Sequence, residues 1–423
     1  MADSSFSYEP INQQLVISDF LLSDVESAEE NRLFDQDKVS GYFNNWLAEF
    51  RDSKNPIREW ATLFWHEHLP CTGRGQSNTF VLGQNYLIWE LYRKNALGNL
   101  RQLLVEYYQN PAAMYFLDIH RSYKEGPSQN FPRELLELYT LGPGNYSEKD
   151  VQEVARCFTG LHFEKEDVYE QKAFRVEDQF DSGVKEILGK SGNFYPNDVI
   201  DIILEKRECA DFIARKAVFF FLGEGFSEGF PRDCGKVYYE SNYDFSHLLD
   251  FMWNHPEAEN PNLKRVKSPI EHLVFLQRDL GLKTVGHKTN GWILRKWGQY
   301  PLSPWSVKGW PQGEAWLQGE YLVHRTHIPG VLLKLANRKD ARDSMAYKIK
   351  SRLLNSNLKD LRYFLDAEWD EEAFYQKLSD LGMLPNQYLL GDKKANDLSL
   401  EACLMHPNYQ YFNPVAQKRL FES

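Results

Sequence analysis

Residues 130–142, with the sequence NFPRELLELYTLG, constrain the fold of this chain more than any other stretch. A proline stands near the start and a glycine at the end, which is the favoured order of these two residues around a helix. Apolar side chains recur along one face of such a helix at Phe131, Leu135 and Leu138. We therefore predict a helix here that packs against the core by this face.

The rest of the chain provides ample material for a helical core. Of the 423 residues, 42% are hydrophobic, which excludes disorder as a general description. Apolar residues recur at helical spacing from residue 39 to residue 159, with Ser147 and Asp150 placed to cap the last of these helices. The same spacing returns at residues 197–206, 209–222, 243–255, 270–280 and 290–298, and again beyond residue 330.

Two segments depart from this helical pattern. Within residues 161–195, strand-like stretches at 172–180 and 184–188 flank a turn at Asp181-Ser182-Gly183, which predicts a small β-hairpin. Residues 299–316 are rich in Trp, Pro and Gly and are too irregular for a helix. We predict a mainly α, multi-helix globular domain with a small β-hairpin and a Trp/Pro/Gly-rich loop.

The net charge of −11 is concentrated at the N-terminus. Residues 1–37 hold nine acidic side chains and one basic side chain, Arg32. We interpret residues 1–37 as an acidic extension, either solvated or docked through its apolar residues, and residues 38–423 as a single large helical domain. The nearly balanced body has no electrostatic footprint for nucleic acid or an anionic membrane, so neither is a predicted partner.

The cysteines and the apolar runs bear on the cellular location. The five cysteines are scattered and are never spaced as Cys-x-x-Cys, which favours a reducing compartment over a zinc ribbon or a disulfide framework. Neither a signal peptide nor a run of 18 apolar residues is visible. We predict a cytoplasmic protein.

The strongest signature of the chain is spread over residues 64–68, 130–142, 146–151, 155–160, 178–189, 267–271, 298–299, 308–316 and 403–410. Together these stretches resemble the signature of a large bacterial family, domain of unknown function 1800. The resemblance implies a fold and a set of marked positions but no established reaction. It also implies a protein partner, because genes of that family are often paired with those of a sulfatase-like family, and it implies export for many members.

His66-Glu67-His68 is the best candidate for a metal site. Imidazoles two residues apart can converge on one divalent ion when the backbone is extended. On a continuous helix they diverge by about 200°, so the hypothesis requires the helix to end near His66, ahead of Pro70. In the alternative, one histidine caps the helix and the other binds a carbonyl group.

Glu134 and Glu137 are candidate catalytic residues, because carboxylates three apart on a helix can form an acid/base pair or bind a metal. In the alternative, Glu134 forms an internal ion pair with Arg121 or Arg156, and Glu137 is solvated. Asp181 is a third candidate, with a turn-forming role as its alternative.

Two departures from the resembled family bear on a metal site. Tyr139 and Phe180 stand where that family often has histidine. The resemblance therefore implies that a metal site built on those two imidazoles is incomplete here, because phenylalanine neither ligates a metal nor donates a proton.

Trp305, Trp310 and Trp316 are candidate stacking surfaces for a sugar, a heterocycle or a peptide. The alternative is that these rings hold the irregular loop onto the helical core. Two hypotheses follow from the whole sequence. One is an enzyme or metal-binding protein with a His/carboxylate site, and the other is a non-catalytic binding or assembly protein that acts with a sulfatase-like partner.

Overall fold

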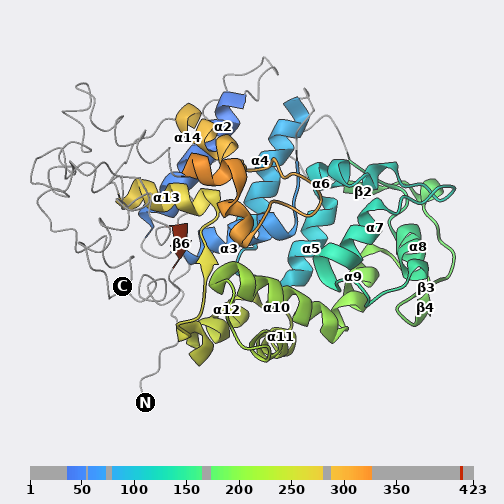
Figure 1. The fold of residues 1–423 in the computed structure, drawn as a ribbon. Coiled ribbons are helices and arrows are strands. Elements are labelled where there is room, and N and C mark those ends of the chain that lie inside the picture. Colours follow the sequence, from blue (N-terminus) through green and yellow to red (C-terminus); the bar gives the residue numbers. More distant parts are fainter. Residues whose placement is uncertain are drawn as a thin grey trace, which may run out of the picture.

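The computed structural model describes residues 36–53, 56–72, 79–163, 173–279, 287–325 and 410–412. This part of the chain is mainly helical, with small two-stranded sheets, as predicted (Figure 1). The strands β2, β3 and β4 lie with α8 at one end of the molecule, and α2, α13 and α14 lie at the opposite end. The predicted acidic extension and the helices predicted beyond residue 330 fall outside the described residues.

Helix α3 (Ile57–His68) is the centre of the N-terminal half. All its residues from Glu59 to His68 are buried, so this helix is covered on every side. It packs against α4, and aromatic rings of α2, such as Trp46, complete the surrounding core. The other helices of this half are α2 (Gln36–Asp52), α4 (Thr79–Lys94), α5 (Leu100–Gln109), α6 (Pro111–Phe116) and the short η1 (Ile119–Arg121).

The stretch at residues 130–142 forms the predicted helix, but its second half is wider than an α-helix. The α-helix α7 (Asn130–Glu134) continues into a π-helical turn, η2 (Leu135–Thr140). The amide groups of Leu141 and Gly142 both donate to the carbonyl of Leu136, each at 3.0 Å. Such π-turns are frequent at functional sites.

The predicted cap of the next helix is confirmed. Helix α8 (Glu148–Cys157) begins with a capping box in which the Ser147 hydroxyl accepts from the Asp150 amide. The Asp150 carboxylate in turn accepts from the Ser147 amide at 2.8 Å. Two of the unpaired amide groups at the helix start are thereby satisfied.

The β segment is present, but the predicted pairing of its strands is wrong. Strand β1 (Leu161–Phe163) pairs with β2 (Ala173–Arg175), and β3 (Lys185–Ile187) pairs with β4 (Lys190–Gly192). The tight hairpin turn is Leu188-Gly189, where both residues have positive φ. A turn of this kind normally carries Asn-Gly or Asp-Gly, so Leu-Gly gave no signal in the sequence.

The C-terminal half contains one helix that the sequence analysis did not predict. Helix α11 (Phe230–Glu240) lies against α10 (Arg207–Leu222). Gly235 reads as a helix breaker, yet a Cβ atom at this position would lie 2.1 Å from Asp211 Oδ1. The glycine therefore lets the two helices approach closely.

The remaining elements lead to the irregular loop. They are α9 (Pro196–Leu204), α12 (Phe245–Asn254), η4 (Pro256–Glu259), β5 (Arg265–Val266), α13 (Pro269–Asp279), α14 (His287–Lys296), η5 (Gly313–Leu317) and β6 (Tyr411–Phe412), with η3 (Glu177–Gln179) after β2. Strand β5 pairs with β6. Apart from η5, residues 299–316 form no helix, as predicted.

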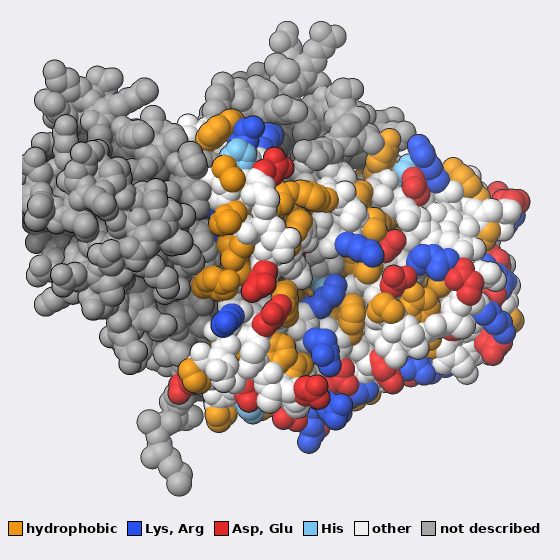
Figure 2. Space-filling view, in the orientation of Figure 1, with side chains coloured by type: hydrophobic (Ala, Val, Ile, Leu, Met, Phe, Trp, Pro, Cys, Tyr) orange, Lys and Arg blue, Asp and Glu red, His pale blue; other side chains and the backbone are white. Residues whose placement is uncertain are grey.

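Neither the charged side chains on the face shown in Figure 2 nor the described cysteines are gathered in a way that points to one kind of site. Acidic and basic side chains are intermixed on the face shown in Figure 2. Cys71, Cys157, Cys209 and Cys234 are buried free thiols, and Cys403 lies outside the described residues. None of the helices in the described ranges is long and apolar enough to cross a membrane.

Candidate functional site

The irregular loop of residues 299–316 lies over the C-terminal end of α3, although the two are far apart in the sequence. The ring of Trp310 packs against His66 with centroids 4.7 Å apart. Gly309 lies so close to α3 that a Cβ atom on it would be 2.8 Å from the carbonyl oxygen of Glu67. Gln299 Nε2 donates to Glu67 Oε1 at 2.7 Å. The loop 299–316 is thus fixed over the helix end.

The surroundings of His66 are those of a side chain with a structural role. Its Nε2 accepts a hydrogen bond from the backbone amide of Leu302 at 2.9 Å, so the irregular loop is tied to this imidazole. The rings of Trp89 and Trp310 surround it at 4.8 and 4.7 Å. Burial lowers the pKa of His66 to about 3, which keeps the imidazole neutral.

His68 contacts a different element. Its Nε2 lies 2.8 Å from the carbonyl oxygen of Tyr139, and Lys216 Nζ donates to the carbonyl of Leu138 at 3.0 Å. These two groups satisfy carbonyls at the end of the π-turn that have no partner within their own helix. Burial lowers the pKa of His68 well below its usual value. This is the carbonyl-binding role that the sequence analysis gave as an alternative.

The two imidazoles do not form the predicted metal pair. Helix α3 continues through His68, so the helix does not end near His66 as the hypothesis required. The rings consequently point to different partners, residue 302 for His66 and residue 139 for His68. Across the described ranges, no group of three or more His, Cys, Asp or Glu residues is placed to hold a metal ion.

Glu134 and Glu137 lie beside each other at the edge of the π-turn. Burial raises the pKa of Glu134, and the neighbouring charge of Glu137 raises it further. Glu137 accepts a hydrogen bond from the Tyr146 hydroxyl at 2.9 Å. The ion pair of Glu134 with Arg121 or Arg156, given as the alternative, is wrong. Arg121 binds Asp118, and Arg156 binds Glu153 and Asp181.

Asp181 forms a turn, the alternative given from the sequence. Its Oδ1 accepts from the Gly183 amide at 2.9 Å, and its Oδ2 accepts from Arg156 Nε at 2.7 Å. The hydrogen bond from Arg156 holds the pKa of Asp181 below its usual value. Asp181 therefore contacts neither Glu134 nor His66, and the structure does not bring these three candidates into one site.

The candidate stacking tryptophans separate into two kinds. Trp310 and Trp316 are buried and pack in the core beneath the loop. Trp305 is 57% exposed, and its indole N–H donates to the carbonyl of Gly298 at 3.1 Å. Only Trp305 among the three presents a broad surface to solvent.

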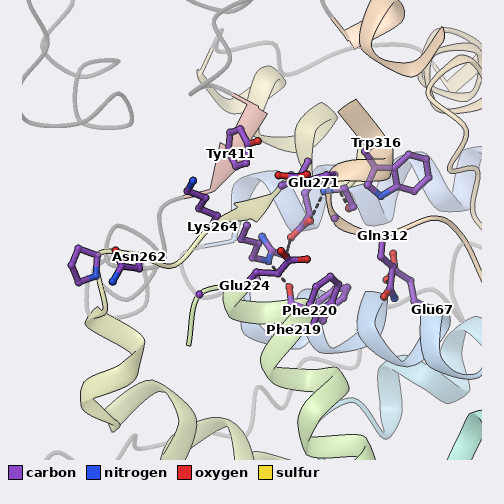
Figure 3. Close-up of a pocket in the computed structure, with 18 residues that line it drawn as sticks. Glu67, Phe219, Phe220, Glu224, Asn262, Lys264, Glu271, Gln312, Trp316 and Tyr411 are labelled. Carbon is purple, nitrogen blue, oxygen red and sulfur yellow. Dashed lines mark hydrogen bonds and ion pairs between the residues drawn. The ribbon is translucent and has the colours of Figure 1, made fainter. Parts of the chain in front are cut away.

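A cavity of about 410 Å³ lies where α3, α10, β5 and η5 meet. This volume is within the range of small-molecule sites. Figure 3 shows Glu67 and Gln312 on one side and Asn262 and Lys264 on the other. The cavity is lined by Glu67, Phe219, Phe220, Gly223, Glu224, Gly225, Pro261, Asn262, Lys264, Arg265, Val266, Ser268, Glu271, Gln312, Gly313, Glu314, Trp316 and Tyr411.

Glu67 is an acidic group of the cavity lining with a strongly raised pKa. It is 7% exposed, and burial raises its pKa to about 8, with the charge of Glu271 acting in the same direction. Gln299 and Gln312 donate hydrogen bonds to its two oxygens, which offsets part of this effect. A carboxyl group of this kind is largely protonated at neutral pH.

A comparison with known protein families shows to which family the chain belongs. The model of a family described as "Protein of unknown function (DUF1800)" matches residues 8–411. The chain belongs to this family. No curated protein and no solved structure gave a significant match. The family match begins inside the segment predicted as an extension, and the boundary at residue 38 stays a prediction.

In this DUF1800 chain, a buried ion pair also lines the cavity. Arg265 binds the Glu271 carboxylate, and both side chains are buried. The second oxygen of Glu271 accepts from the Ser268 amide at 2.8 Å at the start of α13. Ser268 is thus part of the cap of α13, and the same cap orients a charged group of the cavity.

In the sequence of the DUF1800 chain, His66 and His68 were candidate site residues, whereas Glu67 between them was not. A glutamate between two histidines carries no spacing signal of its own. Its role depends on Gln299 and Gln312, which are more than 200 residues away in the sequence. The resemblance did mark all three segments, which was the only available hint.

Proposed function

We propose that this DUF1800 protein is an enzyme that transfers a proton to or from a small molecule in the cavity, with Glu67 as the proton-transferring group. An enzyme is one of the two hypotheses that the sequence left open, but the site proposed here is different. We assign no role to a metal at His66 and His68, since these side chains are engaged with two separate backbone segments.

The observation that carries this proposal is the fixed orientation of the Glu67 carboxyl. The backbone amide of Ile270 donates to Gln299 Oε1 at 3.0 Å, which fixes the Gln299 amide so that its Nε2 faces Glu67. Glu67 Oε1 therefore accepts from Gln299, which favours Oε2 as the oxygen that carries the exchangeable proton. Gln312 Nε2 lies 3.4 Å from Oε2, on the side of the cavity.

This geometry suits acid/base catalysis. A group with a pKa near the working pH is present in both protonation states, which is the optimum for general acid and base catalysis. Such a group contributes roughly 10²- to 10⁴-fold to a rate. The burial of Glu67 itself also limits competing exchange with water.

The test compares the wild-type protein with Glu67→Gln and with Glu228→Gln, a matched change at an exposed glutamate that does not line the cavity. Each purified protein is incubated with a bacterial metabolite extract, and changes are followed by mass spectrometry. We expect metabolites that the wild type and E228Q convert and that E67Q converts about 10²-fold more slowly or less. Equal conversion by E67Q, or no conversion by the wild type, would reject the proposal.

A second candidate function is the binding or assembly role with a sulfatase-like partner. Trp305 favours it, because a fixed, exposed indole is typical of interface anchors. Val323 is also 55% exposed in the segment that follows η5. We expect Trp305→Ser to weaken co-purification with the product of a neighbouring sulfatase-like gene at least tenfold, with Trp292→Ser as the control. Unchanged recovery with W305S would contradict this role.

A further inference from the structure

We propose that the ligand of the cavity is a cation, an amine or guanidinium group carried on an apolar body. This inference rests on the proposed function, since it names the substrate class of the same site. The apolar part of the wall consists of aromatic rings, which are suited both to apolar groups and to cations. These rings belong to Phe219, Phe220, Trp316 and Tyr411.

The charges of the wall favour a cation. The lining contains the carboxylates of Glu224, Glu271 and Glu314 and the cations of Lys264 and Arg265, in addition to Glu67. The wall therefore carries one excess negative charge while Glu67 is neutral and two when Glu67 is ionised. An anionic ligand would be repelled in either state.

The excess negative charge is available to a ligand. Arg265 is already bound to Glu271. Among the residues that the structure describes, neither the Glu224 nor the Glu314 carboxylate forms a hydrogen bond or an ion pair. Figure 3 shows Lys264 at the opposite side of the cavity from Glu67.

Glu224 and Glu67 border the same short segment. A Cβ atom on Gly313 would lie 4.0 Å from Glu224 Oε1, and the preceding residue, Gln312, binds Glu67. A cation placed beside this segment is near both carboxyl groups. Its charge would favour the ionised form of Glu67, so binding at neutral pH should release a proton to solvent.

The test uses three probes of similar shape: benzylamine, benzyl alcohol and benzoate. Their binding is measured by isothermal titration calorimetry at pH 7 in two buffers of different ionisation enthalpy, for the wild type, E67Q, E224Q and the control E228Q. We expect benzylamine to bind at least tenfold more tightly than the other probes and E224Q to weaken it about tenfold. Wild type and E228Q should release close to one proton per benzylamine, and E67Q none.

The outcomes separate the two proposals. Equal or tighter binding of benzoate, or no binding of benzylamine, would overturn the cationic ligand and leave the metabolite test of Glu67 unaffected. Binding of benzylamine without proton release by the wild type would support the ligand class and contradict a proton-transferring role of Glu67.

Discussion

Replacing Glu271 by glutamine is expected to lower the free energy of unfolding by about 3–5 kcal/mol. Glu271 and its partner Arg265 are 1% and 4% exposed, so the substitution leaves a guanidinium charge in the interior without this carboxylate. Breaking a buried ion pair from one side is costly for this reason. Urea denaturation of the wild type and E271Q at one pH measures the loss.

Two further variants show whether the charge itself is responsible. The double variant Arg265→Met/Glu271→Leu removes both charges, and we expect it to be clearly more stable than E271Q, because apolar replacement of a whole buried pair is often neutral. The exposed control E228Q should remain within about 0.5 kcal/mol of the wild type. A loss below about 1 kcal/mol for E271Q would show that the pair is not a major determinant of stability.

The stability of the wild-type protein is expected to fall as the pH rises through the range in which Glu67 titrates. The pKa of Glu67 is raised from 4.5 to about 8 in the folded state. Between these values the folded state holds a proton that the unfolded state has lost. The contribution of this proton to the free energy of unfolding is therefore complete below pH 4.5 and is lost by about pH 8. Between these values the free energy of unfolding falls by about 1.4 kcal/mol per pH unit.

The clearest interval for this measurement lies between pH 6.5 and 8. His66, with a pKa lowered from 6.5 to about 3, has the opposite effect below pH 6.5, since there the unfolded state binds the extra proton. Above pH 6.5 the Glu67 effect amounts to about 2 kcal/mol. Urea midpoints of E67Q should lack this decrease, while E228Q should follow the wild type. Parallel curves for wild type and E67Q would show that Glu67 is already ionised.

The local signals in the sequence were sufficient for most helices. Ser147 and Asp150 cap α8 because the interaction involves residues only three apart. Gly142 ends the central stretch for an equally local reason. Periodicity located α3 for the same kind of reason, since the apolar face of a helix is set by neighbouring residues.

Elements that depend on distant contacts were not predictable in this way. The π-turn of residues 135–140 gave no signal in the sequence, and His68 and Lys216 from two other helices bind its final carbonyls. Helix α11 contains a glycine that is useful only because α10 packs against it. The strand pairing depended on a Leu188-Gly189 turn with an atypical sequence.

The candidate site shows the same division. By itself, the sequence determined the mainly helical class, the helix boundaries set by local caps, and the segments that contain the site. Only the tertiary structure decided which side chain of His66-Glu67-His68 faces the cavity. The reason is physical: both imidazoles are neutral and engaged with backbone groups, whereas the chemistry of Glu67 arises from burial and from two glutamines brought to it by the loop after α14.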